Sequence, residues 1–334
     1  MGKGDWNPKR ILELSGSYWQ TCTLHAGVKL GVFTAIGEEH LTASEVAERL
    51  PAEKRAVGML LNALAAMGFL VKSEGIFSNT PASLTFLVKD APQYLGYMIM
   101  HHHHLVATWA QLGTAVQSGQ PVGGGSSTRD EERRESFLMG MFNNAMLIAP
   151  TLTKAIDLTG RRHLLDLGGG PGTYAIHFCL NHPHLQATVY DLPSTRPFAE
   201  QTIARFGLNN RIAFLDGDYV DETIPGTYDV AWLSHILHGE SPDDCRRIID
   251  KAVAALEPGG LIMIHEFILN NTLDGPLFPA LFSLNMLLHT AGGQSYSEAN
   301  ISEMLTRAGV RDIRRLSFRG PNDSAVMAGI VARP

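Results

Sequence analysis

Ten residues near the middle of the chain, His163-Leu164-Leu165-Asp166-Leu167-Gly168-Gly169-Gly170-Pro171-Gly172, restrict the possible folds most strongly. A short apolar run ends in an acid and then in glycines, and the helix-like stretch Tyr174–Leu180 follows. This order predicts a strand, a glycine turn and a helix. Because glycine has no Cβ and accepts positive φ, such a turn lets the backbone approach a ligand closely. The first amides of the helix then face that ligand.

The acid in this run separates two classes of ligand. A dinucleotide-binding fold has the pattern G-x-G-x-x-G, which from Gly168 requires a glycine where Thr173 stands. A carboxylate at Asp166 would repel a pyrophosphate and attract an ammonium group. S-adenosylmethionine has an amino-acid end and no phosphate, so we expect it as the cofactor and S-adenosylhomocysteine as its product. The simpler alternative is a turn that serves only strand-to-helix packing.

Composition and net charge favour some classes of protein and disfavour others. A chain of 334 residues is long enough for two domains, and 45% hydrophobic with 18% charged residues is typical of a globular protein. The net charge of -6 argues against a general nucleic-acid binder. No apolar run approaches the roughly 20 residues that span a bilayer, and Met1 to Arg10 lack the apolar core of a signal peptide. The three cysteines show no metal-binding spacing. We expect a cytoplasmic protein without nucleic-acid, membrane or metal partners.

Residues 10–90 are predicted to form a small helical domain. Thr42-Ala43-Ser44-Glu45 is a capping box, a helix follows over Ala56–Met67, and two short strands flank Ser73-Glu74-Gly75. This is the order of a winged helix. Ala56–Met67 contains no Lys or Arg, which disfavours a DNA-binding regulator. A first helix over Ile11–Leu30 is apolar on more than one face, so we expect it to pack against its own domain and against a second copy of the chain.

From residue 160 onward, predicted strands alternate with predicted helices. This alternation indicates a parallel sheet with helices on both faces. Ligands of such sheets bind beyond the carboxyl ends of the strands. The expected strands are 163–167, 187–191, 211–215, 228–233, 260–266, 310–318 and 324–332.

Acids follow two of these strands. Asp191 ends the second strand, where a carboxylate can accept two hydrogen bonds from ribose hydroxyls. The third strand is followed by Asp218, which could accept from the adenine amino group, and by Tyr219, which could stack on the ring. We therefore predict the cofactor at the ends of these strands, with a plain surface turn as the alternative.

Histidines follow the fourth strand, where a reacting group would stand beside the cofactor. His235 and His238 are three residues apart, and histidine suits proton abstraction near neutral pH. We expect His238 to be the functional residue and His235 to be structural. Glu266 ends the fifth strand and could orient an imidazole. Glu240 or Glu298 could help.

These motifs, in this order and together with Leu256-Glu257-Pro258-Gly259-Gly260, resemble the class I S-adenosylmethionine-dependent O-methyltransferases. More narrowly, the chain resembles the family of plant caffeate and flavonoid, animal acetylserotonin, and bacterial hydroxyneurosporene and antibiotic O-methyltransferases. The resemblance covers nearly the whole chain. It implies an α/β fold, with a Rossmann-like seven-stranded methyltransferase domain preceded by a mostly helical winged-helix dimerisation domain. The expected limits are 1–100 for the dimerisation domain, 101–150 for a helical connector that contributes to the acceptor pocket, and 151–334 for the methyltransferase domain.

The resemblance also implies a reaction and its residues. The expected reaction transfers a methyl group to a hydroxyl of a small aromatic acceptor, in an intertwined homodimer. His238 matches the general base, Glu266 the acid that orients it, and Glu298 a second such acid. The expected cofactor-binding residues are Asp166, Gly168, Gly170, Gly172, Asp191, Leu192, Asp218, Tyr219 and Ser234. The expected acceptor-pocket residues are Tyr18, Trp19, Phe142, Met146, Met286 and His289, of which Tyr18 and Trp19 can reach the partner's pocket.

Three departures from the family pattern leave other functions open. His238 is followed by Gly239-Glu240 instead of Asp-Trp, Ser234 replaces a lysine near the cofactor, and Gln294-Ser295-Tyr296 replaces an Arg-rich stretch. One alternative is a diverged member that binds the cofactor and catalyses hydroxylation or decarboxylation. A winged-helix regulator and a nicotinamide oxidoreductase are the others, and the latter is disfavoured by Asp166 and Thr173.

Overall fold

The structure, a computed structural model, describes residues 6–123 and 131–332. The chain divides into two compact units. The first comprises Met1–Leu105 and Glu135–Asn143, and the second comprises Val106–Arg134 and Asn144–Pro334. The long helix α9 (Glu131–Ala155) contributes residues to both units.

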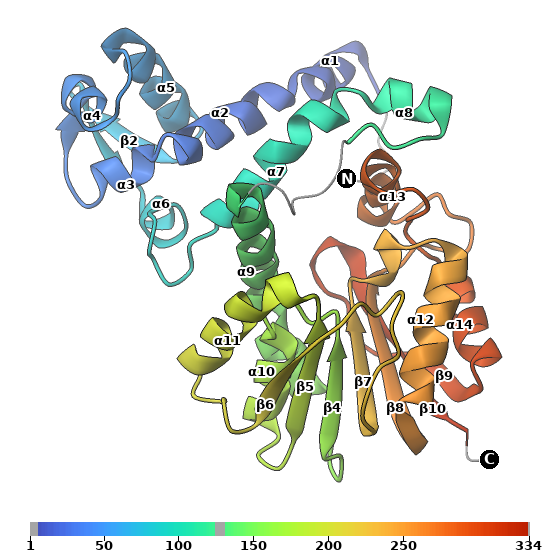
Figure 1. Ribbon diagram of the computed structural model, residues 1–334. Helices are drawn as coiled ribbons and strands as arrows, with labels where there is room; N and C mark the ends of the chain where they lie inside the picture. Colours follow the sequence, from blue (N-terminus) through green and yellow to red (C-terminus); the bar gives the residue numbers. More distant parts are fainter. Residues whose placement is uncertain (1–5, 124–130, 333–334) are drawn as a thin grey trace. The chain divides into compact units, whose positions relative to one another are not determined.

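The first unit is mostly helical (Figure 1). Its three-stranded antiparallel sheet has the order β1-β3-β2, and the predicted turn at Ser73-Glu74-Gly75 joins β2 to β3. The expected capping box is present, because Thr42 accepts from the Glu45 amide and the Glu45 carboxylate accepts from the Thr42 amide. The elements are α1 (Pro8–Gly16), α2 (Tyr18–Lys29), α3 (Val32–Ile36), β1 (Leu41–Thr42), α4 (Ala43–Arg49), α5 (Lys54–Ala66), β2 (Leu70–Ser73), β3 (Ile76–Asn79), α6 (Pro81–Phe86) and most of α7 (Gly96–Trp109).

Two helix predictions in this unit need correction. The single helix expected over Ile11–Leu30 is two helices that meet at Ser17, whose hydroxyl donates to the carbonyl of Leu14. The helix expected over Ala56–Met67 begins at Lys54, because Glu53 caps its first amides. Its first turn therefore contains Lys54 and Arg55, two basic residues that the predicted limits had left outside the helix.

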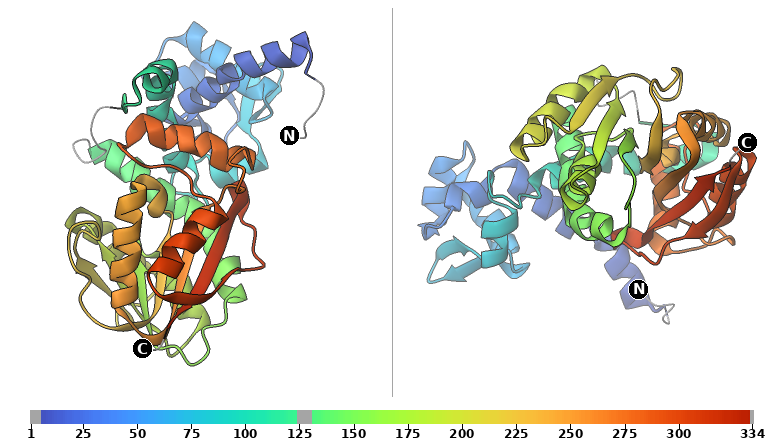
Figure 2. Two further views of the ribbon diagram at one scale, coloured as in Figure 1. Left: turned by 90° about the vertical axis from the view of Figure 1, so that its right-hand side faces the viewer. Right: turned by 90° about the horizontal axis from the view of Figure 1, so that it is seen from below.

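The second unit contains the larger sheet and the helices that cover it (Figures 1 and 2). Its elements are α8 (Leu112–Ser118), β4 (His163–Leu167), α10 (Thr173–Asn181), β5 (Gln186–Asp191), η1 (Pro193–Thr195), α11 (Arg196–Arg205), β6 (Ile212–Asp216), β7 (Tyr228–Ser234), η2 (Leu237–Gly239), α12 (Pro242–Ala254), β8 (Leu256–Phe267), α13 (Leu277–His289), α14 (Glu298–Arg307), β9 (Val310–Arg315), η3 (Pro321–Asp323) and β10 (Ser324–Val331).

Within the described residues, the seven strands of this sheet run in the order β6-β5-β4-β7-β8-β10-β9. The five strands from β6 to β8 pair in parallel, as expected. The expectation of a parallel sheet does not extend to β10, which is antiparallel to both of its neighbours. The connection from β9 to β10 contains no crossover helix, and such a short connection joins antiparallel strands only.

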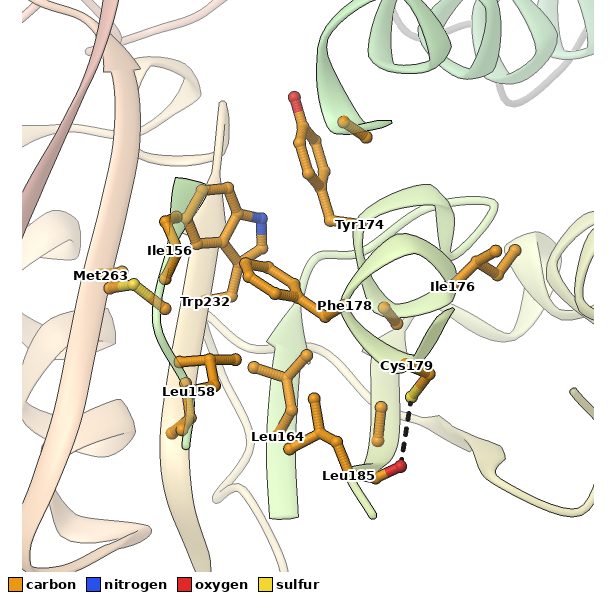
Figure 3. Packing of buried hydrophobic residues seen from close by; sticks show 14 of the residues in the cluster. Ile156, Leu158, Leu164, Tyr174, Ile176, Phe178, Cys179, Leu185, Trp232 and Met263 are labelled. Carbon is orange, nitrogen blue, oxygen red and sulfur yellow. Dashed lines mark hydrogen bonds between the residues drawn. The ribbon is translucent and has the colours of Figure 1, made fainter. Parts of the chain in front are cut away.

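Side chains of the central strands are buried on both faces of the sheet, which explains their continuous apolar runs. Leu164 and Trp232 pack on the face covered by α10 and α11, while Leu165 and Leu233 pack on the face covered by α12 and α14. Figure 3 shows the first of these clusters, in which the Phe178 ring meets Trp232 edge to face at 5.2 Å. This packing fixes the strand ends from which the site is built.

The cluster in Figure 3 predicts a large effect of one core substitution. Phe178 is fully buried, so Phe178→Ala should lower the free energy of unfolding by about 3–5 kcal/mol, since it removes buried apolar surface and leaves a cavity. Leu180→Ala on the same helix is the matched control, because Leu180 is 48% exposed, and it should cost less than about 1 kcal/mol. Chemical denaturation measures both. Equal losses would contradict the described burial.

Candidate functional site

The glycine turn follows β4 directly, and its backbone requires glycine. Gly168, Gly170 and Gly172 have φ of 64°, 54° and 77°, in the left-handed region that side chains with a Cβ rarely adopt. A Cβ on Gly168 would also lie 2.6 Å from Cγ2 of Ile236. Gly172 is the N-cap of α10, so the free amides at the start of this helix open toward the turn.

Asp166 lies beneath this turn with a buried carboxylate. One oxygen accepts from the Ala175 amide at 3.1 Å, and the other has no hydrogen-bond partner among the described residues. Burial raises the pKa of Asp166 to about 7, against the lowering effect of the Ala175 amide and with a further increase from Asp191. The buried Thr173 hydroxyl also has no partner in the described part of the chain. An acid with an unused oxygen fits a cationic ligand, as the amino-acid end of S-adenosylmethionine requires.

Asp191 ends β5 and makes more contacts within the protein than the sequence indicated. Its carboxylate accepts from the Gly170 amide at 2.8 Å, from the Leu192 amide at 2.7 Å and from the Thr195 hydroxyl at 3.2 Å. Burial raises the pKa of Asp191, and these three hydrogen bonds oppose that increase. Asp191 therefore ties the glycine turn to the end of β5, while a carboxylate can accept further hydrogen bonds from a ligand.

Asp218 and Tyr219, two of the predicted cofactor-binding residues, follow β6 in the chain. The Asp218 carboxylate accepts from the Val220 amide at 2.8 Å, so it is held by its own loop. The Tyr219 ring lies beside the glycine turn, 3.1 Å from the position of a Cβ on Gly168. Burial raises the pKa of Tyr219 well above its usual range, so this phenol stays neutral.

Ser234 ends β7 and its hydroxyl lies 3.0 Å from Nδ1 of His265. His265 is buried in β8 and was not predicted as part of the site. Burial holds its pKa well below the usual range, helped by His235 and opposed by Glu266. The ring therefore stays neutral.

The structure brings His238 and Glu266 together. Nδ1 of His238 lies 2.9 Å from Oε2 of Glu266, and the His238 amide donates to Oε1 at 3.3 Å. The carboxylate is 2% exposed. Burial by itself would raise the pKa of Glu266, but the imidazoles of His238 and His235 hold it well below its usual range. A carboxylate only accepts, so in the neutral imidazole the proton sits on Nδ1 and Nε2 keeps a lone pair.

Glu298 has a different partner. It begins α14, and its carboxylate lies 3.3 Å from Nη1 of Arg315 in β9. The side chain is half exposed. This pairing ties α14 to the neighbouring edge strand.

Two phenylalanines that the sequence reasoning missed contact the His238 ring, and a third packs on both of them. The Phe282 ring meets it edge to face at 4.8 Å, and the Phe267 ring stacks on it at 6.0 Å. Phe278 contacts both phenylalanines, at 4.9 and 5.8 Å between ring centres. The spacing of Phe278 and Phe282, four residues apart in a helix, was a signal for one shared face.

The predicted acceptor residues fall in both units. In the second unit, Met286 is buried in α13, Nδ1 of His289 lies 2.8 Å from the Asn285 carbonyl, and Sδ of Met146 lies 3.3 Å from Nε2 of His177. In the first unit, Phe142 is buried, and Tyr18 and Trp19 are exposed on α2.

Possible metal ligands gather at one place in the described residues. The one cluster of possible metal ligands among them is His235, His238 and Glu266, whose ligand atoms lie within 4.8 Å of one another. Its shortest distance is the 2.9 Å hydrogen bond already described. In the same residues, no helix combines the length and apolar character needed to cross a bilayer.

Comparison with known proteins shows the family. The model of an O-methyltransferase domain matches residues 109–311, and that of an O-methyltransferase dimerisation domain matches residues 12–89. The 3-hydroxy-5-methyl-1-naphthoate 3-O-methyltransferase of Streptomyces sahachiroi is 34% identical, over 97% of this chain and 96% of that protein. The tetracenomycin polyketide synthesis 8-O-methyl transferase TcmO of Streptomyces glaucescens is 30% identical, over 96% of each. The solved structure of PigF with SAH is 26% identical, with a TM-score of 0.90 over 97% of this chain and 100% of that one.

The seven-stranded sheet with a glycine turn after β4, preceded by a helical dimerisation domain, defines an S-adenosylmethionine-dependent methyltransferase. More narrowly, the chain belongs to the O-methyltransferase family. It is an O-methyltransferase with S-adenosylmethionine as its cofactor, it acts on a small-molecule acceptor, and its dimerisation domain supports a homodimer. The regulator and the nicotinamide oxidoreductase considered as alternatives are therefore set aside.

The buried acid under the turn generates a prediction about stability and binding. The folded-state pKa of Asp166, about 7, lies above its ordinary value of 3.8, so the ligand-free protein loses stability as pH rises through this range. Asp166→Asn removes the charge and should stabilise the ligand-free protein near pH 8 by on the order of 2 kcal/mol, with no gain near pH 4. The same variant should bind S-adenosylhomocysteine at least ~10-fold more weakly.

Thermal unfolding at both pH values and calorimetry measure these effects. Asp250→Asn, at an exposed position of α12, is the matched control and should change neither quantity. Unchanged affinity in Asp166→Asn would exclude this carboxylate from the cofactor site.

Proposed function

We propose that this chain methylates a hydroxyl group of an aromatic acceptor, with His238 as the general base. The observation that carries the proposal is the 2.9 Å distance between Nδ1 of His238 and the buried Glu266 carboxylate. This contact uses Nδ1 and leaves Nε2 as the atom that can accept a proton. Histidine so oriented by a carboxylate is the arrangement that general-base catalysis uses.

The division of work follows from this geometry. S-adenosylmethionine, when bound, supplies a methyl group that is already activated for transfer. The protein holds the acceptor oxygen in line with that group, which is catalysis by orientation. His238 Nε2 takes the hydroxyl proton as the oxygen attacks, and Glu266 stabilises the imidazolium that forms.

The cofactor-binding roles remain part of the proposal. Asp166 would bind the ammonium group, Asp191 the ribose hydroxyls, and Asp218 the adenine amino group, while Tyr219 packs beside the ring. Leu192 and Ser234 would line the same site. The unpartnered oxygen of Asp166 and the left-handed turn at Gly168, Gly170 and Gly172 support this assignment.

An aromatic acceptor is supported by two observations. The rings of Phe267, Phe278 and Phe282 cluster around His238 and offer flat faces on which a planar ligand can stack. Two relatives are named for a hydroxynaphthoate and for tetracenomycin polyketide synthesis. We infer a fused-ring phenol as the acceptor class, and 3-hydroxy-1-naphthoate is a suitable first probe.

The remaining acceptor-site assignments are proposals of the same kind. Met146, Met286 and His289, all in the second unit, would contribute to the acceptor pocket, and the role of Phe142 stays a prediction. Tyr18 and Trp19, exposed on a single chain, would act from the partner copy of a homodimer. Glu298 would assist the base only if it leaves Arg315.

Loss of the base is the direct test. His238→Asn should lower kcat by about 10²–10⁴-fold, the range that general-base catalysis supplies, without a change in affinity for S-adenosylhomocysteine. His184→Asn, at an exposed position, is the matched control. Rates with labelled methyl donor, and identification of the methylated product, give the result. Full activity of His238→Asn would assign the base to another residue.

Metal removal should leave methyl transfer unchanged. The proposed chemistry needs only a base and an activated methyl group, and the His238–Glu266 hydrogen bond occupies the atoms that a metal would take. Dialysis against a chelator, followed by assay with and without added zinc or magnesium, checks this. Activity that falls on chelation and returns with one metal would overturn the proposed mechanism.

A further inference from the structure

Two imidazoles face the same oxygen of the Glu266 carboxylate. Nδ1 of His238 lies 2.9 Å from Oε2, and Nδ1 of His235 lies 3.5 Å from the same atom. The Phe267 amide also donates to Oε2, at 3.2 Å. The carboxylate that orients the proposed base is therefore shared, and His238 is only one of its partners.

The backbone of His235 holds its ring in this place. His235 has φ of 57°, in the left-handed region that costs free energy for a residue with a Cβ, and its amide donates to the His265 carbonyl at 2.9 Å. Its ring lies 4.4 Å from the His265 ring and 4.3 Å from the Phe267 ring. Its Nδ1 is buried and makes no hydrogen bond to the described residues, so it faces Oε2 as a polar atom without another partner.

The second imidazole matters because a carboxylate that contacted His238 alone would attract its protonated form more strongly. A buried anion 2.9 Å from an imidazole favours the protonated ring. A ring that keeps its proton cannot act as a base at neutral pH. His235 can weaken this attraction in two ways. A neutral ring protonated on Nδ1 places an N–H toward Oε2, and a charged ring places a second cation beside His238.

We propose that His235 is a positioning residue that shares the Glu266 carboxylate and so limits how strongly His238 retains a proton. This inference rests on the proposed role of His238. It differs from the expectation that His235 is structural, and it assigns the left-handed backbone at this position to function.

Two substitutions separate this role from ring packing. His235→Phe keeps a flat ring against His265 and Phe267 and removes the nitrogen. His235→Asn removes the ring, tolerates the left-handed backbone, and places its side-chain amide nitrogen where Nδ1 now lies. A tuning role predicts a defect in the Phe variant and rescue in the Asn variant, and a packing role predicts the reverse.

The test is histidine-ring NMR on the full-length protein saturated with S-adenosylhomocysteine, with the His238 signal identified by its loss in His238→Asn. In His235→Phe, the midpoint of the His238 titration should rise by roughly half a pH unit or more relative to the wild type. This is about a threefold increase in proton affinity. In His235→Asn it should titrate within about 0.2 unit of the wild type. The other titratable groups that interact electrostatically with Glu266 are His265, Cys245 and Tyr296, and Glu240 interacts with His238. All four are the same in all of these proteins.

Kinetics give a second readout where 3-hydroxy-1-naphthoate is turned over. His235→Phe should lose activity several-fold below neutral pH and regain it at alkaline pH, whereas a packing defect would lower the rate at every pH. An unshifted His238 titration in His235→Phe, or a defect confined to His235→Asn, would overturn the inference. Failure of the proposed function is a different outcome, because the NMR titration needs no acceptor and no turnover.

Discussion

The buried carboxyl group of Asp166 meets the start of a helix, and the cofactor end of the second unit is built around this contact. Its carboxylate accepts from an amide in the first turn of α10, where the helix dipole favours an anion. Above it, the glycine turn can close only because Gly168, Gly170 and Gly172 adopt left-handed backbones. Asp191 then holds the turn from the neighbouring strand through the Gly170 amide. Burial costs Asp166 free energy in the absence of a ligand, and a bound cation would offset that cost.

The catalytic proposal depends on a register between two other strands. β7 and β8 pair in parallel with Ser234 opposite His265, so the residues just beyond Ser234 lie beside Glu266. The short helix η2 then turns the His238 amide and ring back toward the carboxylate. A shift of one residue would turn Glu266 to the other face of the sheet, because strand side chains alternate.

Much of this arrangement could be predicted from the sequence. The strand β4 was predicted at its observed limits, and β5, β6 and β7 to within one residue. For β4 and β7 the reason is burial on both faces, which makes a central strand appear as an apolar run between turns. The pairing of His238 with Glu266 followed from the rule that parallel strands end at one edge. The limits of the three expected domains and the roles of the individual site residues stay predictions.

Other features depend on contacts that no local pattern encodes. The antiparallel insertion of β10 is a tertiary outcome. The left-handed backbone of His235 and its approach to Glu266 appear only when β8 lies alongside. Phe267 contacts Phe278 and Phe282, which lie more than ten residues later in the sequence. The sequence therefore indicated only the helical i, i+4 pair of Phe278 and Phe282 in this aromatic cluster.

The central claim is that a largely neutral buried Asp166 becomes charged when the cofactor binds. Its most direct test is to measure how many protons are released when S-adenosylhomocysteine binds. Calorimetry in buffers of different ionisation enthalpy measures it. With a ligand-free pKa of about 7, binding near pH 6 should release close to one proton, and the release should fade above about pH 8. Binding with no proton release at any pH would contradict the account, because Asp166 would then not change its charge on binding and could not be the acid that meets the cofactor's ammonium group.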